Sequence, residues 1–248
     1  MRLARRGLTT KAQLRTIISK LPRETQAHQR HTVSRDIPLA TARAVLDELG
    51  RRLLFREAGG RLRRFRVRAV GGVRRRSPRS KDLDILVTVP DGTRVRGLLA
   101  SAELSGPKAS RGRAALALAE TYASGGRRRS LIVRRGAKRY AVDLFLATRG
   151  EEPYALFHYT GDKDYAIRIR AHAKRRGWKL NQYGLFYAQR PGVRVRGSAA
   201  IRTERQLASF LGVTYRAPAA RAKTRAGAAR EGAASGRRQG GRRQGGRR

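Results

Sequence analysis

An aspartate, Asp143, lies inside the otherwise apolar, β-type stretch Tyr140-Ala-Val-Asp-Leu-Phe-Leu146. A carboxylate that is buried without a partner costs several kcal/mol, so a fold that buries this strand has to supply one. Two kinds of partner are open: a metal ion shared with other carboxylates, or a nearby basic side chain such as Arg139. This requirement constrains the fold more than any other feature of the chain.

A second pattern supplies the other carboxylates. It reads Gly71-Gly-Val-Arg-Arg-Arg-Ser-Pro-Arg-Ser-Lys-Asp-Leu-Asp84, follows the predicted strand 65–70 and runs into the predicted strand 82–89. Asp82 and Asp84 are two residues apart, so both carboxylates leave the same face of an extended strand. With Asp143 they form an all-oxygen set for two Mg²⁺ ions, with Mn²⁺ as the alternative.

The glycines and arginines of the same segment suit a phosphate. At Gly71 and Gly72 the backbone N–H groups can approach an anion closely, and Arg75 can bind its oxygens in a bidentate manner. Either feature alone also occurs in ordinary basic turns. Together with three carboxylates, they predict nucleotidyl transfer.

The charge of the chain indicates its partner. There are 59 Lys and Arg residues against 17 Asp and Glu, which gives a formal net charge of +42. Such an excess is typical of proteins that bind a polyanion, and nucleic acid is the first expectation. Arginine is spread through the whole chain rather than along one amphipathic helix, so a membrane partner is not expected.

The sequence lacks cysteine and lacks long apolar segments, and these two absences exclude some reactions and some cellular locations. There is no cysteine, which excludes disulfides, thiolate zinc sites and a cysteine nucleophile. No run of eighteen apolar residues and no apolar signal segment is found. We expect a soluble, intracellular protein.

Periodicity predicts an α+β fold with a mixed or antiparallel sheet and flanking helices. A helix is expected from Pro38 to a stop at Gly50, and further helices at 165–175 and 204–211. Strands are expected at 65–70, 82–89, 114–122, 130–133 and 140–147, with a hairpin at 178–188. The segment 217–248 contains ten Lys or Arg and repeated Gly-Gly-Arg-Arg units, which predicts a disordered basic tail.

The segment from Gly71 to Asp84 resembles the signature of nucleotidyltransferases in the form found in family X DNA polymerases such as DNA polymerase beta. Three later segments resemble the thumb of that family: Tyr159-Thr-Gly161, the run 167–174 and the run 178–186. The thumb resemblance is the more specific of the two. The match covers about residues 38–217 and reaches weakly back to residue 7.

The resemblance implies a division into a partial fingers-like helical segment (1–37), a catalytic palm (38–148), a thumb-like subdomain (149–216) and the tail (217–248). The family's amino-terminal lyase domain is missing from the match, as in the reduced members found in some large DNA viruses. We therefore expect no deoxyribose-phosphate lyase activity.

Roles for single residues also follow from the resemblance. The metal ligands and catalytic residues would be Asp82, Asp84 and Asp143. The incoming nucleotide would be bound by Gly71, Gly72, Arg75, Lys81, His158, Tyr159 and Gly161, with Tyr159 crowding a 2′-hydroxyl. DNA would be contacted by Arg170, Asn181 and Tyr183. The expected partners are primer–template or gapped DNA and a deoxynucleoside triphosphate, and the protein is expected to be a monomer.

The sequence departs from the family at three positions. Gly72 replaces a usual serine, Ala166 replaces an asparagine that reads the incoming base, and Asp36 replaces an arginine that binds triphosphate, with Arg35 as a stand-in. These departures affect selectivity and fidelity rather than reaction class. Two other functions stay open: a template-independent or RNA-tailing nucleotidyltransferase, and a non-catalytic basic packaging protein.

Overall fold

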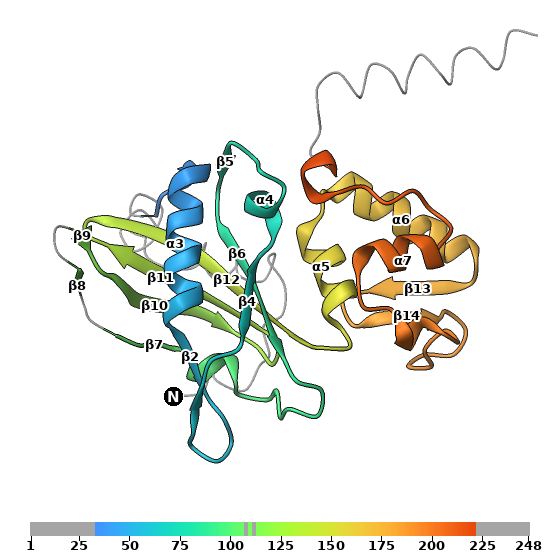
Figure 1. Cartoon of the computed structure of the whole chain (residues 1–248), viewed down its shortest axis with the longest axis horizontal. Coiled ribbons are helices and arrows are strands. Elements are labelled where there is room, and N and C mark those ends of the chain that lie inside the picture. The colour runs from blue at the N-terminus through green and yellow to red at the C-terminus, as the bar shows by residue number, and fades with distance from the viewer. Residues whose placement is uncertain (1–32, 107–108, 111–112, 222–248) are drawn as a thin grey trace, which may run out of the picture.

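The computed structural model describes residues 33–106, 109–110 and 113–221. This part of the chain forms two lobes that lie side by side (Figure 1). The first lobe has a twisted sheet with a long helix across one face. The second has helices packed around a short hairpin.

The described helices are α3 (Leu39–Arg52), α4 (Gly71–Arg74), α5 (Glu152–Thr160), α6 (Lys163–Arg175) and α7 (Glu204–Phe210), with 3₁₀ turns η1 (Leu99–Ser101), η2 (Ser198–Ala200) and η3 (Pro218–Arg221). The described strands are β1 (Ile37–Pro38), β2 (Leu53–Arg56), β3 (Leu62–Arg63), β4 (Arg66–Ala69), β5 (Arg79–Ser80), β6 (Leu83–Val89), β7 (Glu103–Leu104), β8 (Ala109–Ser110), β9 (Arg113–Ala114), β10 (Leu116–Ser124), β11 (Arg128–Arg135), β12 (Lys138–Thr148), β13 (Trp178–Asn181) and β14 (Gly184–Tyr187).

The main sheet has the order β10-β11-β12-β6-β4. Strands β12 and β6 are parallel, and the other neighbours are antiparallel. This is the mixed sheet that the sequence predicts, so the α+β fold class is confirmed. All five of the predicted strands occur, with ends that differ by a few residues.

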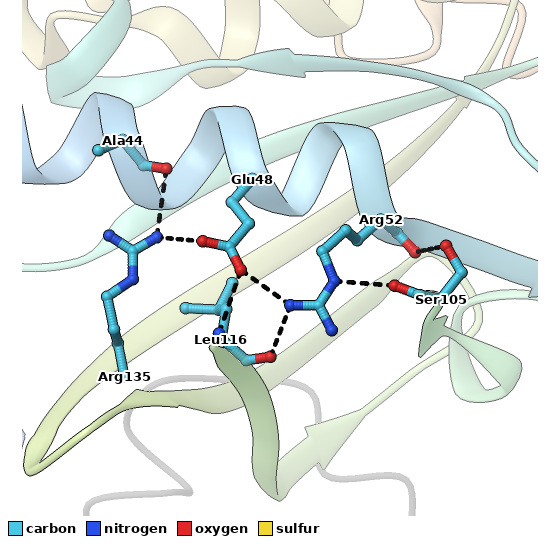
Figure 2. A network of polar contacts seen from close by, with 6 residues as sticks. All are labelled: Ala44, Glu48, Arg52, Ser105, Leu116 and Arg135. Atoms are coloured by element: carbon cyan, nitrogen blue, oxygen red, sulfur yellow. Dashed lines mark hydrogen bonds and ion pairs between the residues drawn. The ribbon is translucent and has the colours of Figure 1, made fainter. Parts of the chain in front are cut away.

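Helix α3 covers one face of this sheet with the stripe Ala42, Val45, Leu46 and Leu49, all buried. The predicted stop at Gly50 is wrong, because the helix continues to Arg52. Arg52 stabilises the extra turn: its guanidinium donates to the Glu48 carboxylate at 2.8 Å and to the carbonyls of Ser105 and Leu116 (Figure 2). These tertiary contacts outweigh the helix-ending tendency of glycine.

Helix α5 covers part of the other face and lies between the lobes (Figure 1). Five consecutive residues from Pro153 to Phe157 are buried, so the segment has no amphipathic period by which a helix is recognised. Ala155 and Leu156 pack on Leu86 and Phe145 of the sheet. Tyr154 and Phe157 pack into the core of the second lobe.

The second lobe confirms two predicted helices and the predicted hairpin. Asp162 caps α6 by accepting from the Tyr165 N–H, and Thr203 with Gln206 forms a capping box on α7. Strands β13 and β14 pair antiparallel, with Asn181 opposite Gly184. This is the small α+β unit that the sequence predicts.

The carboxyl end differs from the prediction, which placed the start of a disordered tail at residue 217. Residues 218–221 form η3, and the Arg221 side chain is buried. Its guanidinium donates to Glu204 at 2.9 Å and stacks on the rings of Tyr165 and Tyr215. A buried, paired arginine thus anchors residues 217–221 to the second lobe.

Other predictions fall outside the described residues. These are the helical segment within 1–32 and the rest of the tail, 222–248. None of the described helices has the length and apolar character needed to span a bilayer.

Candidate active site

Two of the three predicted carboxylates lie on neighbouring strands of the main sheet. Strands β6 and β12 run parallel, and Asp84 is the register partner of Asp143. Paired residues on adjacent strands leave the same face, about 5 Å apart. Asp82 lies one residue before β6 and is partly exposed. The fold therefore places Asp82 and Asp84 at the start of β6, and Asp143 beside Asp84 in the middle of β12.

The Asp143 carboxylate already has two partners. The Ser130 hydroxyl donates to Oδ1, and the Arg128 guanidinium donates to Oδ2 at 2.7 Å. Asp143 is only 7% exposed, whereas the Arg128 side chain is 41% exposed and lies over the Phe145 ring. The basic partner is thus Arg128. Arg139, the arginine suggested by the sequence, pairs instead with Glu120 at 2.8 Å.

Gly71 has to be glycine because of Asp84. Its φ is +58°, which disfavours any L side chain, and a Cβ at this position would lie 2.9 Å from the Asp84 Cγ and overlap the carboxylate. The glycine therefore gives the Asp84 side chain the space it needs.

Within the described ranges, no three acidic or histidine side chains lie close enough together to hold a metal ion as the protein stands. Carboxylate oxygens suit a hard divalent cation, so the residues fit such an ion in kind. Arg128 occupies one of those oxygens. A metal ion bound by Asp143 together with Asp84 would therefore compete with the guanidinium for the Asp143 carboxylate.

Two arginines of the glycine-rich segment, Arg74 and Arg75, connect the lobes. Arg75 donates to the Thr160 carbonyl. Arg74 donates to the Thr160 hydroxyl and to the Glu204 carboxylate, which also binds Arg221. Arg75, predicted to bind triphosphate, thus faces the end of α5. The other predicted phosphate-binding residues on this side are Gly72, which is partly exposed, and Lys81, which is fully on the surface.

His158 and Arg170, predicted to meet the nucleotide and the template, contact each other. The Arg170 Nη2 lies 3.0 Å from the His158 Nδ1. Burial, with the Arg170 charge as a second cause, lowers the pKa of His158 to about 4. His158 is therefore neutral at pH 7, and its Nδ1 accepts from the guanidinium.

Tyr159 stacks on Phe145 of the sheet, with ring centroids 3.9 Å apart. Burial, with the neighbouring Tyr183 as a second cause, raises the pKa of Tyr159 to about 12. Gly161 follows at a φ of +69° and ends the helix beside the Arg75 guanidinium. The segment 158–161 is thus packed between the sheet and Arg75.

The predicted DNA contacts in the hairpin have structural roles in the protein. The Asn181 Oδ1 accepts from the N–H groups of Tyr183 and Gly184 and closes the turn. The Tyr183 ring lies under Arg127, which also pairs with Glu151. This joins the hairpin to the first lobe.

Two departures from the family pattern have local explanations. Ala166, at the expected base-reading position, is 4% exposed and packs in the core of the second lobe. Asp36 forms an exposed ion pair with Arg79.

Sequence reasoning missed Arg128 and Ser130, and a signal for them was present. Gly136 and Ala137 make a two-residue turn between β11 and β12, so Arg135 pairs with Lys138. Counting back along such a hairpin places Ser130 opposite Asp143, and Arg128 opposite Phe145. The turn was sufficient to find Ser130, whereas Arg128 reaches Asp143 from the neighbouring pair of residues.

The chain is similar to known DNA polymerases. A family model described as the DNA polymerase beta thumb matches residues 155–222. The Repair DNA polymerase X of an African swine fever virus isolate from Kenya is 35% identical over 185 residues, which cover 73% of this chain and 97% of that protein. DNA polymerase lambda of Rattus norvegicus is 28% identical over 162 residues, 62% of this chain and 28% of that protein.

Among solved structures, the ternary primer–template (P/T) complex of Leishmania infantum polymerase beta matches with a TM-score of 0.55 at 20% identity, covering 87% of this chain and 89% of that one. The ternary gap complex of the same polymerase matches with a TM-score of 0.56, covering 89% of this chain and 83% of that one. At this identity, the structural likeness concerns the fold.

Proposed function

Because this chain belongs to family X of the DNA polymerases, and is thus a nucleotidyltransferase that uses divalent metal ions, we propose that it fills short gaps in DNA during repair. It copies a template strand by adding deoxynucleotides to the 3′-hydroxyl of a primer. The relatives named as repair polymerases and the fold shared with a gap-bound polymerase beta support this proposal.

The observation that carries the proposal is the pairing of Asp84 with Asp143 on parallel strands, with Asp82 two residues before Asp84. These carboxylates would hold two Mg²⁺ ions, with Mn²⁺ as the alternative. The ions would activate the primer hydroxyl and neutralise the triphosphate charge. Asp143 would serve the primer side.

The remaining residues would bind and orient substrates. The triphosphate would contact Gly71, Gly72, Arg75 and Lys81, and the sugar would lie against the segment 158–161. Tyr159 is held in place by its stacking on Phe145, which suits a residue that excludes a 2′-hydroxyl. DNA would contact Arg170, Asn181 and Tyr183 on the second lobe. Residues 38–148 would act as palm and 149–216 as thumb.

The experiment is primer extension by the purified full chain in Mg²⁺ on three substrates: a one-nucleotide gap, an open primer–template and a primer without template. We expect the fastest incorporation on the gap, incorporation of the base complementary to the template, and no addition without template. Equal addition with and without a template would indicate template-independent tailing instead.

The matched control is Asp82→Asn, which keeps the size of the side chain and removes a metal ligand. Nucleotide addition should disappear in this variant while gel-shift affinity for DNA is kept. Binding of DNA without any nucleotide addition by the unmodified chain would favour a packaging role.

A further inference from the structure

A small basic cavity lies at the end of β6 away from Asp84. Its volume is about 190 Å³, and it is bounded by the junction of β3 with β4, the end of β6 and the turn before α5. One acid, Glu152, lines it together with four arginines: Arg63, Arg64, Arg66 and Arg149. None of these residues belongs to the candidate active site.

The cavity is separate from the acids, although both lie on the same face of the sheet. Thr88 lines the cavity and is four residues, or about 13 Å, along β6 from Asp84. Between the two, Leu86 is covered by Ala155 and Leu156 of α5. Helix α5 therefore separates the cavity from Asp84.

A buried carboxylate holds two arginines at the cavity. Glu152 is 8% exposed and accepts from the Thr88 hydroxyl at 3.1 Å. It pairs with Arg66 at 3.6 Å and with Arg68 at 3.5 Å, and both arginine side chains stay largely exposed. One negative charge thus positions two positive charges, and the surplus faces solvent.

The other guanidinium groups of the cavity are only partly compensated. The exposed side chain of Arg64 forms no ion pair or hydrogen bond with the described part of the chain. Arg149 is exposed and interacts electrostatically with the Asp91 carboxylate, and Arg63 pairs with Glu57 at 3.3 Å. Five arginines in and beside the cavity therefore meet three carboxylates, which leaves two positive charges.

We propose that this cavity binds backbone phosphates of a second DNA segment, separate from the DNA that reaches Asp84. Exposed guanidinium groups bind phosphate oxygens in a bidentate manner and without regard to base sequence. DNA is favoured over an acidic protein because a polymerase at work is already bound to DNA, so further duplex is present at high local concentration. The proposal does not depend on which DNA substrate the active site prefers.

The test is modification of arginine by p-hydroxyphenylglyoxal in the full chain, with mass spectrometry of each arginine. It compares the free protein, the protein with one equivalent of gapped DNA, and that complex with an excess of blunt duplex. We expect Arg64 and Arg149 to stay reactive with the gapped DNA and to lose reactivity when the duplex is added. Arg43, which is exposed on α3, is the control and should react equally in all three states.

Two double variants of equal net charge extend the test. Arg64→Gln/Arg149→Gln removes two charges from the cavity, and Arg43→Gln/Arg51→Gln removes two exposed charges from α3. Anisotropy of a labelled duplex, titrated with protein that already carries gapped DNA, measures the second binding event.

In the cavity variant, affinity for the second duplex should fall about 5- to 50-fold at about 0.1 M salt, and the slope of log affinity against log salt should flatten by about one to two units. The α3 variant should change this affinity less than about twofold. Single-turnover nucleotide addition and affinity for gapped DNA should be unchanged in both variants.

Unchanged reactivity of Arg64 and Arg149 in excess duplex would overturn the proposal. Equal losses in the two double variants would also overturn it, because net charge alone would then explain the binding. Protection already at one equivalent of gapped DNA would assign the cavity to the DNA at the active site instead, and equal protection by poly-glutamate would favour an acidic protein partner. If the chain adds no nucleotide, the proposed function fails, and the modification pattern still decides the role of the cavity.

Discussion

At the scale of single residues, the buried carboxylate of Asp143 is held by hydrogen bonds from neighbouring side chains. It is almost fully buried and binds Arg128 and Ser130 in the protein alone. The same carboxylate is needed for a metal ion in the proposed reaction. Arg128 supplies the positive charge that this buried carboxylate needs in the protein alone.

Replacing Asp84 or Asp143 by Asn should reduce single-turnover nucleotide addition by at least about a thousandfold, since metal positioning is lost. DNA affinity should be unchanged or slightly higher, because a negative charge near phosphates is removed. Rapid-quench kinetics and gel-shift titrations measure the two effects. Asp47→Asn, on the outer side of α3, is the matched control, and retained turnover in Asp143→Asn would remove that residue from the site.

His158 gives a prediction for pH dependence. Its pKa is lowered from 6.5 to about 4 in the folded protein, so between these values the unfolded chain binds more protons than the folded one. Stability contributed by neutral His158 is therefore complete above pH 6.5 and is lost as the pH falls toward 4. Urea unfolding of the full chain and of His158→Gln, which cannot titrate, should show a steeper acid-side loss in the full chain. Parallel pH profiles would contradict this.

At the scale of secondary-structure elements, α3 is joined to the sheet by one carboxylate. Glu48 accepts from the Leu116 N–H at 3.1 Å, from Arg52 and from Arg135 (Figure 2). Burial alone would raise the pKa of Glu48, but these hydrogen bonds and the Arg135 charge together lower it below 4.5. The network ties the helix to β10 and β11.

Glu48→Gln should lower the free energy of unfolding by about 1–2 kcal/mol near pH 7, because two arginines lose their charged partner. A carboxylate with a lowered pKa contributes stability above its unfolded value of 4.5, and this is lost as the pH falls below it. The difference between the two proteins in urea unfolding should thus shrink below pH 4.5. Glu103→Gln, at a half-exposed ion pair, is the control.

The sequence predicts these elements well where apolar residues are periodic, as in α3 and β12, and poorly where burial is uniform, as in α5. It also identifies Asp82, Asp84 and Asp143 as candidate metal ligands, because carboxylates are rare on apolar strands and need a partner when buried. It did not identify Ser130 and Arg128, the partners of Asp143. Nor did it predict the link of Arg74 with Glu204, which are 130 residues apart.

At the scale of the whole molecule, a strongly basic carboxyl-terminal segment follows the folded polymerase lobes. The formal net charge is +42, and residues 222–248 contain nine Lys and Arg with one Glu. Arg221 belongs to the second lobe through Glu204, so a truncation that respects the fold should end after residue 221 rather than 216. That boundary allows the contribution of the basic end to be measured separately.

Deleting residues 222–248 should weaken DNA binding strongly at low salt and little at high salt. If about four to seven of the nine charges neutralise phosphates, the slope of log affinity against log salt should flatten by about four to six units. Single-turnover rates at saturating DNA should match those of the full chain. Fluorescence anisotropy at several salt concentrations gives the slope, and an unchanged slope would mean that these residues do not contact DNA.

The two-residue turn at Gly136 and Ala137 sets the register between β11 and β12, and so decides which side chains lie beside Asp143. A substitution of Ala137 changes only the tip of the hairpin. Adding or removing one residue instead forces a bulge or a slipped register, and a slip by one turns every side chain to the opposite face. Arg128 and Ser130 would then no longer meet Asp143. Over evolutionary time, this hairpin is expected to keep its length and to keep Gly136, whose φ of +59° disfavours any L side chain, so an insertion there would mark descendants that have lost the activity.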